Sequence, residues 1–328
     1  RKKRNQMQAT DILIIGAGIS GLLCAAELQK RGFTVCVLDK GRGLGGRMAT
    51  RRMAGGRLDH GAQYFTVRDP RLQAYVDQWL EAGVLKEWFC HLPEDSNPDG
   101  HPRYCGLQGM TDVPKHLAKD IDVCTSQQVT ELARDTNVWM ARTASGDTFL
   151  ARQLVITAPL PQALNLLDMT GLRYANSDAE ALRAVRYEKG LATLAILDGA
   201  SGIAEPGGIE IHEAPLTWIG DNQQKGISPD VSAITIHADA AFAEEHWDSP
   251  NEVRGELMLA AAKPYLKAKV VGYNCHRWGF TTPINPWPEM YYQNKGLQLT
   301  LAGDAFGGAR IEGAALSGIA AAEVVSTN

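Results

Sequence analysis

Two glycine clusters, separated by one expected helix and one expected strand, constrain the fold of this chain more than any other feature. The first lies in DILIIGAGISG, residues 11–21, and follows a continuous apolar run. Such a run is expected where a strand is buried on both faces of a parallel sheet. The second cluster, GRGLGGR at residues 41–47, begins two residues after Asp39. A chain with both clusters is expected to bind a ligand that extends beyond the first glycine turn.

The first cluster is typical of a dinucleotide-binding strand-helix-strand unit. Residues 20–32 have the apolar spacing of a helix that ends at a glycine, and residues 33–40, FTVCVLDK, read as the next strand. Three glycines permit the tight turn, the approach of backbone to a pyrophosphate, and helix-strand packing, and these are Gly16, Gly18 and Gly21. The helix N-terminus offers N–H groups to phosphates, while Asp39 can accept hydrogen bonds from ribose hydroxyls.

From the second cluster onward the chain resembles the flavin-containing amine oxidase and protoporphyrinogen oxidase group, whose second glycine motif lies along FAD. LDHGAQYF, residues 58–65, looks like the segment that this group places beside the isoalloxazine. Three later stretches fit the same resemblance: residues 106–120, 123–132 and 154–167. In the second of these, the resemblance implies that the backbone near Val129 faces the adenine.

The C-terminal block, LQLTLAGDAFGGARIEGAALSGIAAAEVV at residues 297–325, reads as a strand, a loop and a helix. The resemblance implies that Gly303 and Asp304 contact the ribityl and pyrophosphate region of FAD. It also implies that the helix opening at residues 312–314 points its N-terminus at the flavin pyrimidine ring. The positive end of a helix dipole there would stabilise the anionic reduced flavin. No cysteine motif of the kind used for covalent attachment lies beside Gly303, so FAD is expected to bind noncovalently.

Within this group the chain is most similar to the renalase-like flavoproteins, particularly the bacterial members, through residues 39–48, 58–69, 275–280 and 302–318. The resemblance implies an FAD-dependent oxidase of a small-molecule substrate. Hydride would pass to flavin N5 from the 2- or 6-dihydro isomers of NAD(P)H, giving NAD(P)+ and, with molecular oxygen as acceptor, hydrogen peroxide. Two alternatives stay open: an FAD-dependent amine or other CH-NH/CH-CH oxidoreductase of the same fold, and a non-catalytic flavin-binding sensor.

The candidate residues follow from these motifs. The cofactor-binding candidates are Gly16, Gly18, Ile19, Ser20, Gly21, Asp39, Lys40, Gly45, Gly46, Arg47, His60, Gly61, Ala62, Gln63, Tyr64, Val129, Gly303, Asp304, Glu312, Gly313 and Ala314. No side chain is singled out as catalytic, because flavin supplies the hydride chemistry and only a planar donor must be stacked near N5. The candidates for lining the substrate pocket are Gln63, Tyr64, His237, Arg277 and Trp278, with Arg277 able to hold a pyridine carboxamide, ribose or phosphate.

The predicted fold class is α/β, with a Rossmann-like FAD-binding domain and a discontinuous substrate domain of mixed sheet and helices, as in p-hydroxybenzoate hydroxylase. Residues 67–82 predict an amphipathic helix, and apolar or alternating stretches between residues 191 and 238 predict antiparallel strands. The expected FAD-binding domain comprises residues 7–66, 105–172 and 293–328, the substrate domain residues 67–104 and 173–292, and a flexible leader residues 1–6.

Composition argues against several other classes of protein. The formal net charge of −4 and the pI near 6.1 give no basic face for nucleic acid. No apolar run approaches the roughly 18 residues of a membrane span. The six cysteines are scattered without a C-x-x-C pair or a metal-ligand spacing, which favours reduced thiols in the cytoplasm and no metal site.

Overall fold

The computed structural model describes residues 9–327, so the predicted leader of residues 1–6 lies outside the described part of the chain. The chain forms two compact units. Unit 1 comprises the residues up to Gly46, Pro114–Arg186, and those from Pro283 onward. Unit 2 comprises Arg47–Val113 and Tyr187–Thr282. Among residues 9–327, no helix has both the length and the apolar character needed to cross a membrane.

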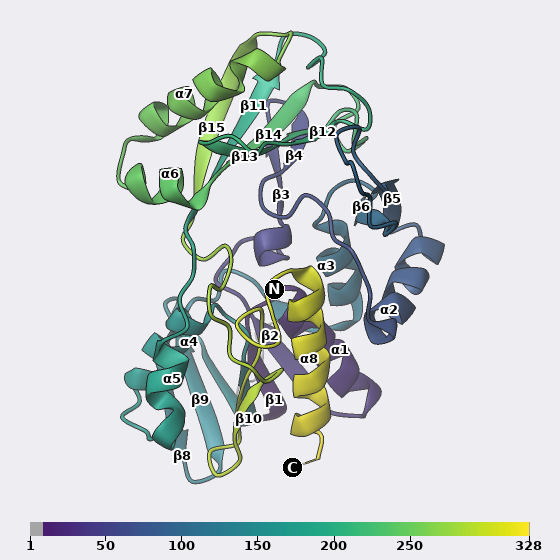
Figure 1. The fold of residues 1–328 in the computed structure, drawn as a ribbon. Helices are drawn as coiled ribbons and strands as arrows, with labels where there is room; N and C mark the ends of the chain where they lie inside the picture. Colours follow the sequence, from purple (N-terminus) through teal and green to yellow (C-terminus); the bar gives the residue numbers. More distant parts are fainter. Residues whose placement is uncertain (1–8, 328) are drawn as a thin grey trace. The chain divides into compact units, whose positions relative to one another are not determined.

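Unit 1 is built on an eight-stranded sheet with β1 near its centre (Figure 1). The main strand order is β16 (Tyr292–Asn294), β17 (Leu299–Leu301), β10 (Thr148–Ile156), β1 (Thr10–Ile15), β2 (Val35–Leu38) and β7 (Asp122–Cys124). β1 pairs in parallel with both β2 and β10, and β10 with β17. The ribbon of β8 (Val129–Asp135) and β9 (Val138–Thr143) joins β10 in antiparallel fashion.

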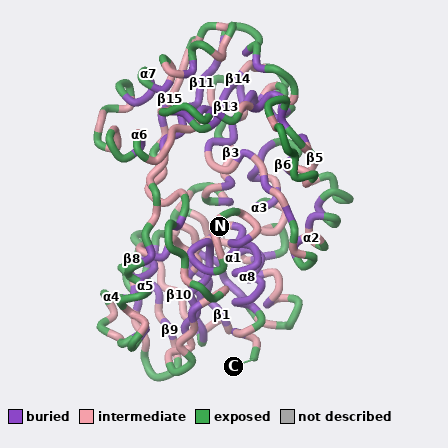
Figure 2. Tube along the Cα trace, viewed as in Figure 1, coloured by how far each residue is buried: buried purple, intermediate pink, exposed green. Residues whose placement is uncertain are grey.

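Two helices of unit 1 follow the glycine-rich motifs as the sequence predicts, and these are α1 (Ile19–Lys30) and α8 (Ile311–Val325). The other helical elements are α4 (Leu160–Asp168), α5 (Ala179–Arg183), the connecting helix α3 (Asp112–Leu117) and the short turns η2 (Ala118–Asp120) and η3 (Asn176–Asp178). The β1 residues Ile12, Leu13 and Ile14 are completely buried, which explains why this strand is continuously apolar. Figure 2 shows the same run as part of the buried interior of this unit.

The helices α1 and α8 pack closely because glycine occupies their contact. A Cβ built at Gly318 would lie 2.1 Å from the carbonyl oxygen of Ser20, and one at Gly21 would lie 2.0 Å from that of Gly16. Neither approach leaves room for a methyl group. The small residues of the last helix therefore set how near α8 comes to the first glycine turn.

Unit 2 contains a five-stranded antiparallel sheet and two small hairpins. The sheet order is β12 (Gly208–Glu210), β13 (Leu216–Asp221), β14 (Ala233–Ala238), β11 (Gly190–Leu197) and β15 (Val270–Trp278). The hairpins are β3 (Thr50–Met53) with β4 (Gly56–Asp59), and β5 (Leu85–Phe89) with β6 (Arg103–Gly106). The remaining elements are α2 (Pro70–Glu81), α6 (Ala240–Glu245), α7 (Asn251–Ala262), η1 (Gly46–Met48) and η4 (Lys263–Tyr265).

One face of this sheet carries the apolar core of unit 2. Ile219, Ile234 and Ile236 are fully buried there, in one cluster with Met258 of α7 and Ala243 of α6. Side chains alternate between faces along a strand, so the neighbours of these isoleucines point to the other face. That other face holds the polar and aromatic residues described below.

The boundaries of the compact units differ from those of the two predicted domains. The first segment of the predicted FAD-binding domain reaches residue 66, whereas the first segment of unit 1 ends at Gly46. The β3–β4 hairpin explains this difference, because Leu58 of β4 packs with Leu194 and Ala233 of the five-stranded sheet. A segment can pack in one compact unit and still contribute to a cofactor site, so the division into FAD-binding and substrate domains stays a prediction.

We expect Gly318→Ala to lower the thermal midpoint of unfolding, measured by circular dichroism. Overpacking costs about 1–3 kcal/mol, and the obstacle is the Ser20 backbone carbonyl, which cannot rotate away. This cost outweighs the gain in helix propensity of about 1 kcal/mol. The matched control is Gly43→Ala, because no described atom lies within 4 Å of its Cβ position. An unchanged or higher midpoint for Gly318→Ala would contradict the prediction.

Candidate active site

The carboxyl ends of three parallel strands bring the predicted nucleotide-binding residues of unit 1 to one edge of the sheet. Gly16 follows β1, Asp39 follows β2 and Gly303 begins two residues after β17. β1 has β2 on one side and β10 on the other, so the order of the strands reverses here. Doubly wound sheets bind nucleotides at such a point.

The first glycine turn leaves room and donors for a phosphate. Gly16 has φ +115°, a conformation that favours glycine, and the N-cap residue of α1 is Gly18, which has no side chain to cap the helix. No described atom lies within 4 Å of a Cβ built at Gly18. The Ser20 side-chain oxygen is buried and has no hydrogen-bond partner among residues 9–327. Free N–H groups, an unpartnered hydroxyl and open space fit a pyrophosphate.

Asp39 ties the first turn to the second glycine cluster. Its Oδ2 accepts from the Ala17 N–H at 2.7 Å, and its Oδ1 accepts from the Gly41 N–H at 2.7 Å. The Gly45 N–H in turn donates to the Ala17 carbonyl at 3.1 Å. Each carboxylate oxygen retains a further acceptor site, so Asp39 can still receive a ribose hydroxyl.

Two further predicted residues of unit 1 lie beside Asp39 in the fold. The Gln127 N–H donates to the Asp39 carbonyl at 2.8 Å, so the loop that leads into Val129 runs against the end of β2. Val129 itself is buried at the start of β8. The Lys40 ammonium is exposed and donates to Gln162 Oε1 at 3.2 Å.

The C-terminal motif, which is separate from the two N-terminal glycine clusters, forms another turn at Gly303, before α8. Gly303 has φ +126°, and its N–H donates to Ser317 Oγ at 2.9 Å, which holds the turn against the helix. Asp304 is 6% exposed. The N-cap residue of α8, Arg310, makes no side-chain capping bond, and the first turn of the helix contains Glu312, Gly313 and Ala314. The first N–H groups of a helix have no partner within it, so backbone donors are expected at this helix end.

The predicted cofactor residues from Arg47 to Tyr64 belong to unit 2. The Arg47 guanidinium donates to the carbonyls of Phe280 and Thr281 at 3.1 and 3.2 Å, and the Arg47 carbonyl accepts from the Ala62 N–H at 2.9 Å. A Cβ at Gly61 would lie 2.0 Å from that carbonyl. The glycine therefore lets two segments of backbone meet.

A row of side chains crosses the sheet of unit 2 on the face opposite α7. The register pairs Glu210 with Trp218, Trp218 with His237, and Ala192 with both His237 and His276. Directly paired residues share a face of the sheet. The row thus extends from β12 to β15.

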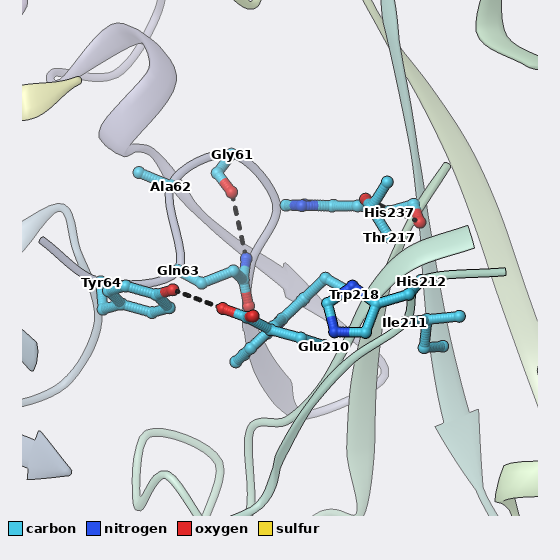
Figure 3. A pocket seen from close by; sticks show the side chains of 10 residues that line it. All are labelled: Gly61, Ala62, Gln63, Tyr64, Glu210, Ile211, His212, Thr217, Trp218 and His237. Carbon is cyan, nitrogen blue, oxygen red and sulfur yellow. Dashed lines mark hydrogen bonds between the residues drawn. The ribbon is translucent and has the colours of Figure 1, made fainter. Parts of the chain in front are cut away.

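One end of this row lines a cavity of about 470 Å³ (Figure 3). Its lining residues come from the loop after β4 and from β12, β13, β14 and the loop between β12 and β13. They are Gly61, Ala62, Gln63, Tyr64, Glu210, Ile211, His212, Thr217, Trp218 and His237. Tyr64 and Trp218 meet edge to face, with ring centroids 5.7 Å apart, and form an aromatic wall.

Three polar atoms of this lining are buried without a hydrogen-bond partner in the described chain: Gln63 Oε1, Trp218 Nε1 and His237 Nε2. The Gln63 amide nitrogen donates to the carbonyls of Asp59 and Gly61 at 2.7 and 3.1 Å, which fixes the amide orientation. Burial lowers the pKa of His237 to about 4, although a hydrogen bond with the His60 backbone opposes this shift. The amide and the indole carry no charge, and the lowered pKa makes His237 neutral at pH 7 as well.

The other end of the row holds a cluster of His60, His276 and Trp278. Their ring centroids lie 4.4 to 4.9 Å apart. Trp278 Nε1 donates to the His60 carbonyl at 2.9 Å, and His60 Nδ1 is bonded to the Ala49 carbonyl at 2.8 Å. Burial and then the neighbouring His276 lower the pKa of His60 to about 4. Trp278 thus holds the backbone at His60 and does not line the cavity.

Arg277 lies on the other face of the sheet. It alternates with His276 and Trp278 along β15, and its guanidinium donates to the Trp247 carbonyl at 3.1 Å and stacks on the Trp247 ring. Of the five predicted pocket residues, Gln63, Tyr64 and His237 line the cavity, while Arg277 and Trp278 do not. Strand alternation was the signal in the sequence that separates Arg277 from its neighbours.

A fully buried ion pair supports the loop that carries Gln63. Lys225 Nζ lies 2.7 Å from Asp59 Oδ2, and both side chains are at most 1% exposed. The ammonium also donates to the Gln63 carbonyl and lies over the Trp88 ring. Asp59 Oδ1 accepts from Thr50 Oγ1 at 2.6 Å and from the Met110 N–H at 2.9 Å. Neither Lys225 nor Trp218 was among the predicted residues.

Comparisons with known proteins agree with this architecture. The NAD(P)-binding Rossmann-like domain family matches residues 14–79, and the flavin-containing amine oxidoreductase family matches residues 96–326. Renalase from Mus musculus is 24% identical over 336 residues, which cover 96% of this chain and 98% of renalase.

Solved structures of amine oxidases share the fold. Cyclohexylamine oxidase from Brevibacterium oxydans superposes with a TM-score of 0.71 at 14% identity, covering 98% of this chain and 99% of that enzyme. Putrescine oxidase bound to putrescine gives a TM-score of 0.68 at 14% identity, covering 98% of this chain and 100% of that enzyme.

The chain belongs to the flavin-containing amine oxidoreductase family. It is an FAD-dependent oxidoreductase, which confirms the predicted enzyme class and cofactor. The predicted similarity to renalase is also confirmed, and it extends over nearly the whole chain.

We expect Lys225→Met to destabilise the protein by about 3–5 kcal/mol, because it leaves the Asp59 carboxylate buried without its counter-ion. The measurement is thermal unfolding at pH 7. The control is Lys189→Met, which removes a pair between a partly exposed lysine and the exposed Glu244 and should cost under about 1 kcal/mol. Equal effects of the two substitutions would contradict a structural role for the buried pair.

His237 should make the protein less stable at acidic pH. Its pKa is lowered to about 4 in the folded state, so between pH 6.5 and 4 the unfolded chain binds the proton more readily and stability falls. We expect His237→Gln to remove on the order of 2 kcal/mol of the loss between pH 7 and 5, measured by chemical denaturation. Substitution of the exposed His91 by Gln serves as control and should leave the pH dependence unchanged.

Proposed function

We propose that this enzyme is a renalase-like oxidase that takes hydride from the 2- or 6-dihydro isomers of NAD(P)H and returns NAD(P)+. FAD, when bound, supplies the hydride acceptor at N5 and passes the electrons to oxygen as hydrogen peroxide. The observation that carries the proposal is the cavity of unit 2. Its wall is aromatic and its buried unpartnered polar atoms are all neutral, which suits the uncharged planar ring of such a donor.

The residues proposed to hold FAD are those of the two glycine turns and of the segment before the cavity. Ser20 and the open N-terminus of α1 suit the pyrophosphate, and Asp39 suits the ribose. The turn that begins at Gly303 and the N-terminus of α8 are proposed to offer backbone donors to the flavin end. Residues from Arg47 to Tyr64 are proposed to line the isoalloxazine, and attachment is proposed to be noncovalent.

The side chains of the cavity are proposed to bind and orient the donor, and no proton-transfer group is required of them. The Tyr64 and Trp218 rings offer faces on which a planar ring can stack. A neutral His237 neither repels nor attracts a charged ring, and its Nε2 atom is buried in the cavity lining. For hydride transfer, the protein has to stack the donor ring in position and exclude water from the reacting atoms.

The architecture proposed for the whole chain is the two-domain one of p-hydroxybenzoate hydroxylase. A parallel sheet with a nucleotide edge and a separate antiparallel sheet covered by helices support it. Molecular oxygen as the electron acceptor and a cytoplasmic location belong to the same proposal. The scattered spacing of the cysteines in the sequence supports the location.

Amine oxidation is the second candidate, and one feature of the cavity favours it. The exposed Glu210 carboxylate lines the cavity and accepts from the Tyr64 hydroxyl at 3.4 Å. A carboxylate beside aromatic faces attracts a protonated amine. The likeness in fold to cyclohexylamine oxidase and putrescine oxidase supports the same alternative.

Anaerobic mixing of the flavin-loaded enzyme with each donor class tests the proposal. We expect 2- and 6-dihydroNAD(P) to bleach the oxidised flavin, with recovery of colour and formation of peroxide when air is admitted. Ordinary 4-dihydroNAD(P)H and simple amines serve as controls and should bleach at least 100-fold more slowly, a difference of about 2.7 kcal/mol in barrier. Faster bleaching by amines would replace the proposal with its alternative.

A further inference from the structure

Two of the unpartnered atoms in the cavity of unit 2 are a donor and an acceptor that face nearly the same point. Gln63 and Trp218 are each 6% exposed, and neither Gln63 Oε1 nor Trp218 Nε1 bonds to any described residue. A Cβ built at Gly220 would lie 2.7 Å from Trp218 Nε1 and 2.9 Å from Gln63 Oε1. Both atoms are buried and lie beside the same point, which a side chain at residue 220 would fill.

The orientation of both groups is fixed by their surroundings. Both hydrogens of the Gln63 amide nitrogen are used, on the carbonyls of Asp59 and Gly61, so its oxygen must serve as the acceptor. An indole nitrogen is only a donor. A buried donor and acceptor left without partners cost free energy, and a ligand that satisfies both recovers it. Figure 3 shows the two side chains next to each other in the cavity lining.

The ligand group that matches this pair presents an acceptor and a donor from one small planar unit. A primary carboxamide does so through its carbonyl oxygen and its amino group. A carboxylate has no N–H for Gln63 Oε1 and would meet the Glu210 carboxylate on the same cavity wall. An ammonium group has no acceptor for Trp218 Nε1.

We propose that Trp218 and Gln63 form a carboxamide subsite, in which Trp218 Nε1 donates to the ligand carbonyl and Gln63 Oε1 accepts from its amino group. The inference rests on the proposed function, since the dihydronicotinamide ring carries such a carboxamide. It adds the residues that select this ring and that set which edge of the ring faces the sheet.

Ligand-observed NMR titrations of the holoenzyme with nicotinamide, 3-methylpyridine and nicotinate test the subsite. Nicotinamide should bind about tenfold more tightly than the other two, as expected for hydrogen bonds made in a buried site. Trp218→Phe keeps the aromatic wall but removes the donor, so it should weaken nicotinamide about tenfold and leave 3-methylpyridine within about twofold.

The matched control is Trp88→Phe. Trp88 belongs to the same aromatic cluster, but its Nε1 already donates to the Pro206 carbonyl at 2.9 Å and it does not line the cavity. This variant should keep the preference for nicotinamide. Gly220→Ala is a second test, because its methyl group would occupy the space between the two atoms and should abolish the preference.

The outcomes separate the subsite from the proposed reaction. Equal binding of nicotinamide and 3-methylpyridine, or a preference that survives in Trp218→Phe, overturns the subsite even if the mis-reduced isomers bleach the flavin. A preference for nicotinamide that is lost in Trp218→Phe supports the subsite, even if amines prove to be the donors that reduce the flavin.

Discussion

The buried pair of Lys225 and Asp59 is the interaction on which the cavity of unit 2 depends. Asp59 ends β4 and Lys225 lies in the loop after β13, so the pair joins the hairpin to the sheet. The same ammonium donates to the Gln63 carbonyl. Because charges so deep in a protein are tolerated only when fully paired, this geometry permits little variation. The backbone that presents Gln63 and Tyr64 is thereby held in one conformation.

In unit 1 the candidate site is held in place mainly by backbone turns and backbone hydrogen bonds, whereas in unit 2 it is held by a buried ion pair. Its turns at Gly16 and Gly303 need positive φ, and Asp39 uses both carboxylate oxygens on backbone N–H groups. Such a surface suits phosphate and ribose, which all dinucleotides share. Under the proposed function, selectivity for a particular donor comes from unit 2, where aromatic rings and single polar atoms line the cavity.

The sequence was sufficient to predict those parts of the fold that depend on neighbouring residues in the chain. The apolar β1, the glycines after it and Asp39 define a βαβ unit within about 30 residues, as expected for this motif. The site on the antiparallel sheet depends on pairing between distant strands. Trp218 and His237 become neighbours only through the register of β13 with β14. We predict no strand over residues 270–278 from the sequence, so alternation is not applied there and Arg277 is placed in the pocket with Trp278. In the structure Arg277 points to the other face of the sheet.

The division of the chain among the units also determines the order in which they can be completed during synthesis. All segments of unit 2 have been made once Thr282 is added. Unit 1 must still wait for β17, which pairs with β10, and for α8, which packs against α1. Non-local contacts of this kind form slowly. The antiparallel sheet can therefore be complete on the ribosome while the nucleotide edge, begun at the first residues of β1, is finished only with the last helix.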